Sequence, residues 1–272
     1  WYRYIPFNDL PQVLNPLDGF FQNCNSSPYL ATGNRVDIQK VLPDWTGIED
    51  HQTNRALRSL ETFGIQTSIT RNDFFDYKYD VEYSKESVMA YVRDKYIEDM
   101  KDNNQSILEE ALLLIKNWNL KADSLNTSAA LALIVLPNAF KIDDLKYDKN
   151  EITKNLYETI NFLKLKFGRI DVPYGKVIRL VRGEKNLPLS GGPDLLRAIY
   201  FKKKEDVYQG IAGDCYFQAV EWDPKGEISA WSVHQYGSAT SNKISKHFND
   251  QSSLFSKHQM KQIRSLQDDQ KE

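Results

Sequence analysis

Apolar residues recur at helical spacing through the middle of the chain. The segment 57–63 carries leucine or phenylalanine every third residue behind a cap at Thr53 or Asn54, which predicts an amphipathic helix. The same spacing predicts three later helices, which cover residues 88–100, 107–118 and 152–167. The run 128–136 is apolar on all sides and ends at Pro137, so it predicts a buried helix.

Capping residues mark the expected ends of these helices. Thr70–Asp73 resembles a capping box, and Ser106–Glu109 has the form of one. Ser84 is the expected opening of the helix that continues to residue 100. Gly64 and Gly168 are the expected stops, because glycine readily adopts the left-handed conformation that ends many helices.

The last third of the chain has strand and turn signals. Residues 177–181 predict one strand, and two more within 213–236 flank Asp223-Pro-Lys-Gly226, where proline and glycine suit a type I turn. Residues 213–236 are therefore predicted to form a β-hairpin, and both of its faces are apolar, as in a central strand. The lysine run 202–204 is expected in a solvated loop, and a short helix is expected around 249–266.

Together these segments predict an α+β fold in three parts. The first is an irregular arm rich in proline, glycine and asparagine, the second is a helical block, and the third consists of antiparallel strands, the hairpin and a C-terminal tail. Their ranges are 1–52, 53–168 and 169–272.

Composition narrows the class of protein. The apolar fraction of 41% and the charged fraction of 26% are typical of a globular chain. The net charge of −2 argues against a general nucleic-acid binder, which would present a basic face. No apolar run reaches the roughly 18 residues of a membrane helix, so no membrane span is expected.

Cysteine and histidine form no clear metal-binding or disulfide pattern. Cys24 and Cys215 are predicted to be free, buried thiols, with a single disulfide between them as the alternative. His234, His247 and His258 lack the spacing of a zinc site, so no metal is assigned to them.

The most informative stretch is residues 11–28, which read Pro-Gln-Val-Leu-Asn-Pro-Leu-Asp-Gly-Phe-Phe-Gln-Asn-Cys-Asn-Ser-Ser-Pro. This stretch resembles a segment in the β subunit of the penicillin amidase family of N-terminal nucleophile hydrolases. The resemblance places Asn25 where the family has an asparagine of the oxyanion hole, a role that suits a side-chain amide donor. Without the resemblance, Asn23 and Asn25 would be interpreted as loop residues that bond their own backbone.

Two neighbouring positions acquire roles from the same resemblance. Thr53-Asn-Arg-Ala-Leu-Arg58 is similar to a family segment whose arginine supports the active site, so Arg55 is a candidate catalytic residue. The alternative is an arginine that pairs with a carboxylate at a helix start, and Arg58 is expected to be structural. Cys24 stands where penicillin G acylases carry a tryptophan of the acyl pocket. It is therefore a candidate substrate-binding residue, and its small size implies a pocket of different shape, as in acylases that accept aliphatic chains.

Further blocks extend the resemblance over nearly the whole chain. Residues 187–194 are similar to a structural loop of the family, and 213–222 and 245–251 are similar to its late hairpin and the segment that follows. Asp194 and Asp214 each lie beside a turn glycine and are not predicted to act as an acid–base pair.

The resemblance implies that the chain is the C-terminal part of an acylase β subunit. Its fold would be part of an αββα sandwich, with the helical block inserted before the antiparallel strands. The complete enzyme would hydrolyse amides of N-acylated small molecules, such as N-acyl-homoserine lactones, penicillin-like compounds or lipopeptides. Its partners would be the α subunit and the N-terminal part of the β subunit. The family also implies zymogen processing and a periplasmic or secreted location.

Three expectations follow for this chain. It is predicted to be inactive by itself, because Trp1 cannot serve as the N-terminal nucleophile. No cofactor is expected. Asp37 stands where some relatives place a calcium ligand, but the other calcium ligands of those relatives lie upstream of this segment. Calcium is therefore an alternative only for the complete enzyme. The rival interpretation is a non-catalytic interaction module on the same scaffold.

Overall fold

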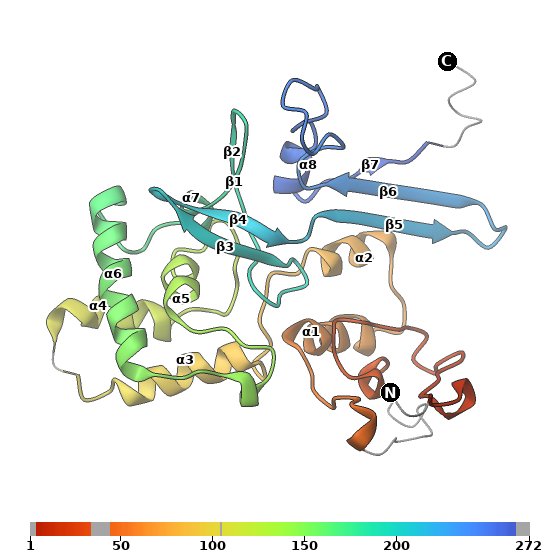
Figure 1. Ribbon diagram of the computed structural model, residues 1–272, viewed down its shortest axis with the longest axis horizontal. Helices are drawn as coiled ribbons and strands as arrows, with labels where there is room; N and C mark the ends of the chain where they lie inside the picture. The colour runs from red at the N-terminus through yellow and green to blue at the C-terminus, as the bar shows by residue number, and fades with distance from the viewer. Residues whose placement is uncertain (1–3, 34–43, 104, 265–272) are drawn as a thin grey trace.

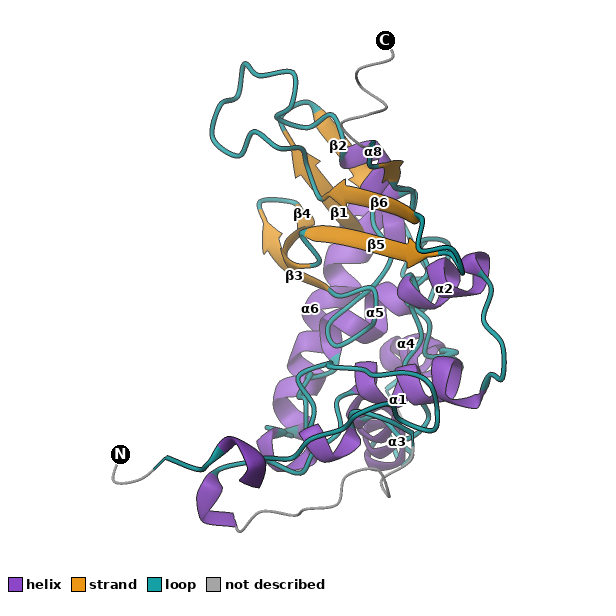
Figure 2. Ribbon diagram, turned by 90° about the vertical axis from the view of Figure 1, so that its right-hand side faces the viewer, coloured by secondary structure: helices purple, strands orange, loops and turns teal. Residues whose placement is uncertain are grey.

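The computed structural model describes residues 4–33, 44–103 and 105–264, and it has the α+β fold that the sequence predicts. Helices fill the lower part of the molecule in Figure 2, and the strands lie above them. The α-helices are α1 (Asn54–Thr62), α2 (Arg71–Lys78), α3 (Val88–Asp99), α4 (Ser106–Lys116), α5 (Ala129–Val135), α6 (Lys149–Phe167), α7 (Tyr174–Val177) and α8 (Ser252–Ser256). The strands are β1 (Ile178–Arg182), β2 (Lys185–Pro188), β3 (Ile199–Lys204), β4 (Val207–Gly213), β5 (Tyr216–Trp222), β6 (Ile228–His234) and β7 (Lys261–Gln262).

Two groups of strands are separated in space. Figure 1 shows β1 to β4 beside α5 and α6, whereas β5 to β7 extend over α2 on the other side of the molecule. The N-terminal arm lies below α2 and around α1, and its regular elements are short 3₁₀ turns. These turns are η1 (Phe7–Asp9), η2 (Pro28–Leu30) and η4 (Asp44–Thr46); η5 (Phe63–Ile65) and η6 (Ile142–Asp144) follow in the helical block.

Several helix ends agree with their predicted caps. Thr53 caps α1 by accepting a hydrogen bond from the N–H of Ala56, and Thr70 forms a capping box with Asp73 at the start of α2. Gly168 ends α6 at a φ of 74°.

Two helix starts differ from the prediction. α3 begins at Val88 and is capped by Ser87, whereas the predicted cap, Ser84, donates its hydroxyl proton to Glu61 at 2.5 Å. The predicted capping box at Ser106 is also absent, because Ser106 is already the first helical residue of α4. In both places the sequence offers two polar residues within one turn, Ser84 and Ser87 before α3 and Gln105 and Ser106 at α4. The packing of each helix decides which of the two is the capping residue.

The helix α5 forms the centre of the helical block, as its apolar sequence predicts. Every residue of α5 except Ile134 is buried, and the helix packs against α4 and α6. Leu131 and Leu156 have no exposed surface at this contact. Each such leucine stabilises the fold by about 1.5–3 kcal/mol relative to an exposed one.

The first sheet is mixed, not antiparallel throughout. Its strand order is β2-β1-β4-β3, and β1 runs parallel to β4 with Ile178 opposite Tyr208. The lysine run 202–204, predicted to be a loop, lies in β3 and pairs with β4. Its side chains are exposed, so three lysines are tolerated at the end of an edge strand.

The predicted hairpin is confirmed. β5 and β6 pair in an unbroken antiparallel register from Tyr216↔His234 to Trp222↔Ile228, and the N–H of Gly226 donates to the Asp223 carbonyl at 2.9 Å. Only one face is covered: Phe217 is buried, while Trp222 remains 64% exposed.

The cysteines are both free, as predicted, but only one is buried. Cys24 is 8% exposed, whereas Cys215 lies at the surface, which corrects the expectation of two buried thiols. Cys215 precedes β5 at the point where the chain leaves the first sheet, so the alternation of the hairpin does not yet apply to it.

The C-terminal segment contains less helix than predicted. Residues 252–256 form α8, and the chain then extends to β7, which pairs with β6. Between them His258 stacks on Tyr79 with parallel rings 4.7 Å apart, and its Nε2 contacts the hydroxyl of Ser190. Burial, reinforced by nearby Arg197, lowers the pKa of His258 to about 4.

We expect His258→Phe to flatten part of the pH dependence of stability. The pKa of His258 falls from an ordinary 6.5 to about 4 in the fold, so on acidification the unfolded chain binds the proton first. As the pH falls from about 6.5 to 4, the free energy of unfolding of the wild-type chain should therefore decrease relative to that of His258→Phe. Above about pH 6.5 the difference between the two free energies should stay constant. Urea unfolding at a series of pH values measures this difference, and a difference that does not change with pH would contradict it.

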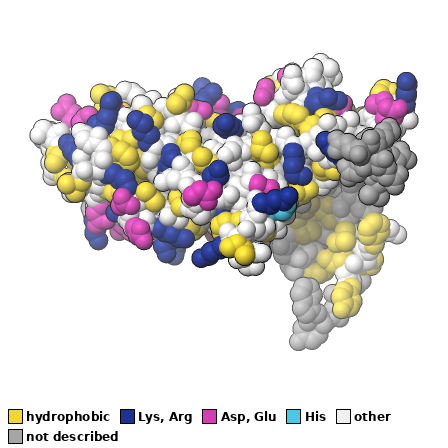
Figure 3. Space-filling model, turned by 90° about the horizontal axis from the view of Figure 1, so that it is seen from above, with side chains coloured by type: hydrophobic (Ala, Val, Ile, Leu, Met, Phe, Trp, Pro, Cys, Tyr) yellow, Lys and Arg dark blue, Asp and Glu magenta, His cyan; other side chains and the backbone are white. Residues whose placement is uncertain are grey.

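Basic and acidic side chains are interspersed on the face of the molecule seen in Figure 3, so this face carries no large patch of a single charge.

None of the described helices is long and apolar enough to span a membrane. Within the described ranges no three His, Cys, Asp or Glu side chains gather as metal ligands would. Asp37, the position of the calcium alternative, lies outside the described residues.

Candidate functional site

Asn25 lies in a loop that closes on itself by hydrogen bonds. The N–H of Gln22 donates to the Ala31 carbonyl at 2.8 Å, and the Gln22 side chain donates to the Leu30 carbonyl at 2.6 Å. Asn25 itself is exposed and has a φ of 55°, a left-handed conformation that asparagine adopts more readily than most residues. The loop therefore presents the Asn25 side chain at its surface.

Thr53 ties this loop to the start of α1. Its hydroxyl accepts a hydrogen bond from the N–H of Ala56 and donates its proton to the carbonyl of Cys24 at 2.9 Å. A single buried side chain thus caps the helix and holds the residue before Asn25. This explains why residues far apart in sequence meet here.

Arg55 orients the amide of Asn25. Its Nη2 donates to Oδ1 of Asn25 at 2.9 Å. Because a guanidinium can only donate, the oxygen of the amide must face Arg55, and the Nδ2 donor lies at the opposite corner. Among the described residues Nδ2 of Asn25 has no acceptor. The arrangement leaves one N–H donor group, held in place, for another molecule.

Asp194 holds Arg55 from behind. Asp194 is 3% exposed, and its carboxylate accepts from Nε of Arg55 at 3.1 Å and from the N–H of Asn54 at 2.7 Å. Its carbonyl also accepts from the Asn54 side chain at 2.9 Å. Burial raises the pKa of Asp194, and the bonds from Asn54 and Arg55 act against that rise. The carboxylate faces the N-terminus of α1, where a negative charge is stabilised.

The sequence did not single out Asp194 as a site residue. It belongs to the loop 187–194, which was predicted to be structural. The loop is indeed tightly folded: a side chain at Gly191 would come within 2.3 Å of the Arg197 carbonyl, and Asp194 has a φ of 57°. An aspartate after two glycines and a proline was the available signal, but its partner lies 139 residues away.

Cys24 lines an apolar cavity of about 580 Å³ next to this chain of contacts. Aromatic side chains from η5, α2 and β6 form much of its wall: Phe63, Phe74, Phe75 and Trp231. Burial raises the pKa of the Cys24 thiol, and its Sγ lies 3.7 Å from the Ser59 hydroxyl. The thiol is therefore neutral near pH 7, which suits a wall residue and not a nucleophile.

Arg58 has the structural role that was expected of it. It pairs with Asp80 at 2.6 Å and with Glu61 at 2.7 Å. Burial alone would lower the pKa of Arg58, but the bonds to these carboxylates outweigh burial and raise the pKa. Glu61 lies on α1 itself, so it is the pair with Asp80 that joins α1 to the segment after α2.

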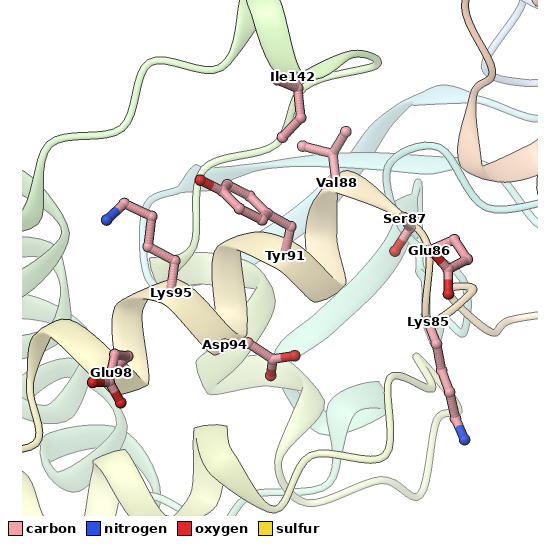
Figure 4. Close-up of a pocket in the computed structure, with 9 residues that line it drawn as sticks. All are labelled: Lys85, Glu86, Ser87, Val88, Tyr91, Asp94, Lys95, Glu98 and Ile142. Carbon is pink, nitrogen blue, oxygen red and sulfur yellow. The ribbon is translucent and has the colours of Figure 1, made fainter.

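A groove of about 700 Å³ lies elsewhere, along α3 and the residues just before it. Figure 4 shows Val88, Tyr91 and Ile142 on one side of it, with charged side chains spread along the helix. None of the predicted site residues lines this groove, and its mixed charges do not converge on a point. We therefore place the candidate site at Asn25.

The comparison with known families decides the family of the chain. The family model described as penicillin amidase matches residues 1–272, the whole sequence. The chain belongs to the penicillin amidase family. This confirms the resemblance that was based on residues 11–28.

Among solved structures, this member of the penicillin amidase family is similar to a thermostable penicillin G acylase from Alcaligenes faecalis in orthorhombic form. The TM-score is 0.48 and the sequence identity is 12%. The match covers 100% of this chain and 58% of that chain. The chain thus spans less than two thirds of the length of that acylase.

Proposed function

We propose that this chain is the C-terminal portion of an acylase that hydrolyses amide bonds of N-acylated small molecules. The observation that carries the proposal is the chain of contacts Asp194–Arg55–Asn25, which presents a fixed amide N–H next to an apolar cavity. The N-terminal nucleophile would come from a preceding part of the enzyme. The periplasmic or secreted location and the processing of a precursor belong to the same proposal.

The proposed role of Asn25 follows from where charge develops during amide hydrolysis. When the nucleophile attacks the carbonyl carbon, its own α-amino group takes the proton and the carbonyl oxygen becomes negative. The free Nδ2–H of Asn25 can donate to this oxygen. Arg55 donates a hydrogen bond to the amide oxygen of Asn25, so its positive charge polarises the amide and strengthens Nδ2–H as a donor to the oxyanion.

The cavity beside Cys24 would receive the acyl group of the substrate. Its aromatic walls suit an apolar chain, and its volume falls within the range of about 300–1,000 Å³ that small-molecule sites occupy. Homoserine lactones, penicillin-like compounds and lipopeptides are candidate substrates, since each joins an acyl chain to a polar amine through an amide bond.

The isolated 272-residue chain should not hydrolyse an acyl amide, because the nucleophile of the proposed acylase would belong to a preceding segment. Co-production with the preceding segments of the natural protein should restore hydrolysis, measured by the release of a chromogenic amine. N-terminal sequencing of the active preparation should find a second chain that begins with Ser, Cys or Thr. Turnover by the isolated chain would refute this division of roles.

The hairpin sheet indicates where the preceding part would bind. β5 is the edge of the sheet β5-β6-β7 in the described residues. Tyr216 and Trp222 on β5 and Ile228 on β6 are 44%, 64% and 65% exposed on its outer face. An unpaired apolar edge invites another strand. The alternative function is an interaction module without chemistry, which would fold without that preceding part.

We expect the isolated chain to self-associate through this edge, with sedimentation velocity as the measurement. Trp222→Lys should shift the chain toward monomer, because a lysine on an edge strand opposes strand pairing. Leu165→Lys on α6 is the matched control, since Leu165 is also exposed (89%) but lies outside the sheet. A monomeric unmodified chain that unfolds cooperatively would favour the interaction module.

A further inference from the structure

A lysine lies in the wall of the apolar cavity. Lys78, the last residue of α2, lines both the cavity of about 580 Å³ and a neighbouring one of about 200 Å³. Its Nζ donates to the Leu196 carbonyl at 2.8 Å and lies 4.0 Å from the centre of the Phe217 ring. These contacts hold the ammonium group between the two cavities.

The charges around Lys78 do not balance. Nζ of Lys78 and Nη1 of Arg197 each lie 3.6 Å from the same oxygen, Oδ2 of Asp214. Arg197 has no exposed surface, whereas the Lys78 side chain keeps 32% of its surface, so two cations share one carboxylate at the wall of the cavity. His258, which adjoins the cluster, is neutral near pH 7 because its pKa is about 4.

The other charged pair at the cavity does not supply the missing negative charge. Arg71 and Glu221 both line the cavity, and they pair with each other at 2.6 Å. Burial lowers the pKa of Lys78, because the apolar surroundings disfavour its ammonium form. A bound anion would offset this cost.

We propose that the cavity is a binding site for an organic anion with an apolar body and one carboxylate, and that the carboxylate meets Lys78. The aromatic walls contributed by Phe63, Phe74 and Trp231 match the apolar body, and the excess positive charge matches the carboxylate. A single negative charge balances the cluster, whereas a dianion would reverse its sign. The inference builds on the proposed function because it concerns the same cavity, but binding requires no hydrolysis.

Isothermal titration of the natural protein tests the site with 4-phenylbutyrate and its primary amide, two ligands with the same apolar body. We expect the acid to bind at least tenfold more tightly than the amide at pH 7. Lys78→Met should weaken acid binding by roughly 10- to 100-fold, as for the loss of a charge-assisted hydrogen bond, and change amide binding little. Lys78→Arg should keep the preference for the acid. Lys154→Met, an exposed lysine of α6, is the matched control and should bind like the wild type.

Lys78→Met should fold, because it leaves Arg197 and Asp214 as a balanced pair. Equal affinity of the wild type for acid and amide, or a preference for the acid that survives in Lys78→Met, would refute the site. If Lys78→Met does not fold, the shorter polar variant Lys78→Gln carries the same expectation. A protein that binds the acid through Lys78 but hydrolyses no acyl amide would refute the acylase and leave the anion site standing.

Discussion

Asn25→Ala should lower kcat of the complete acylase by roughly 10²- to 10³-fold, with a much smaller effect on KM. The expected loss is that of one oxyanion donor, about 2.7–4 kcal/mol of transition-state stabilisation. The structure gives a reason to expect the full effect, because Arg55 fixes the amide with its N–H end free. Steady-state hydrolysis of a chromogenic acyl amide measures the change.

Two further variants separate chemistry from loop structure. Asn25→Gly fits the φ of 55° without strain and lacks the donor, so it should lose as much activity as Asn25→Ala. Asn150→Ala removes an exposed asparagine of α6 and should leave kcat unchanged. If Asn25→Gly retained more than a tenth of the activity, the Asn25 amide would only shape its loop.

Asp194→Ala should destabilise the fold by about 3 kcal/mol and impair turnover as well. The substitution leaves Arg55 and the N–H of Asn54 without their buried acceptor, and breaking a buried pair costs roughly 3–5 kcal/mol. We expect the lower end of this energy range because the Arg55 side chain is 19% exposed, so water can solvate part of the unpaired guanidinium. Turnover should fall because Arg55 would no longer be held against Asn25. Urea unfolding measures the stability.

Asp206→Ala is the matched control for this prediction. Asp206 also accepts from a cation, Lys166 at 2.8 Å, but its side chain is 80% exposed. Exposed pairs of this kind contribute little to stability, so the control should unfold nearly as the wild type does. Equal stability of the two variants would mean that Asp194 does not support the site.

The two ends of the Asn25–Arg55 contact could be named from the sequence, because each lies in a motif of the family. Their contact could not be derived from either motif. It depends on the Thr53 hydroxyl, which bonds both the first turn of α1 and the Cys24 carbonyl. Asp194 escaped prediction altogether because its role exists only after the loop 187–194 has packed against α1. No local pattern encodes a partner 139 residues away.

Local signals were sufficient for most elements of the fold. The all-apolar run before Pro137 could only be a buried helix, and a turn sequence between two alternating segments could only be a hairpin. Both features are encoded within about 20 residues, where spacing and turn chemistry control the outcome.

Only the tertiary structure decided the features that depend on distant partners. β1 runs parallel to β4, and the lysines 202–204 lie in a strand because β4 offers them backbone partners. The cavity wall is assembled from η5, α2 and β6, and the carboxylate that Lys78 and Arg197 share belongs to Asp214, which is far from Lys78 in sequence. The sequence by itself determined the helices, the hairpin and the family of this protein. Strand pairing and side-chain burial depend on which surfaces pack together, so the arrangement and the charges of the site could be read only from the tertiary structure.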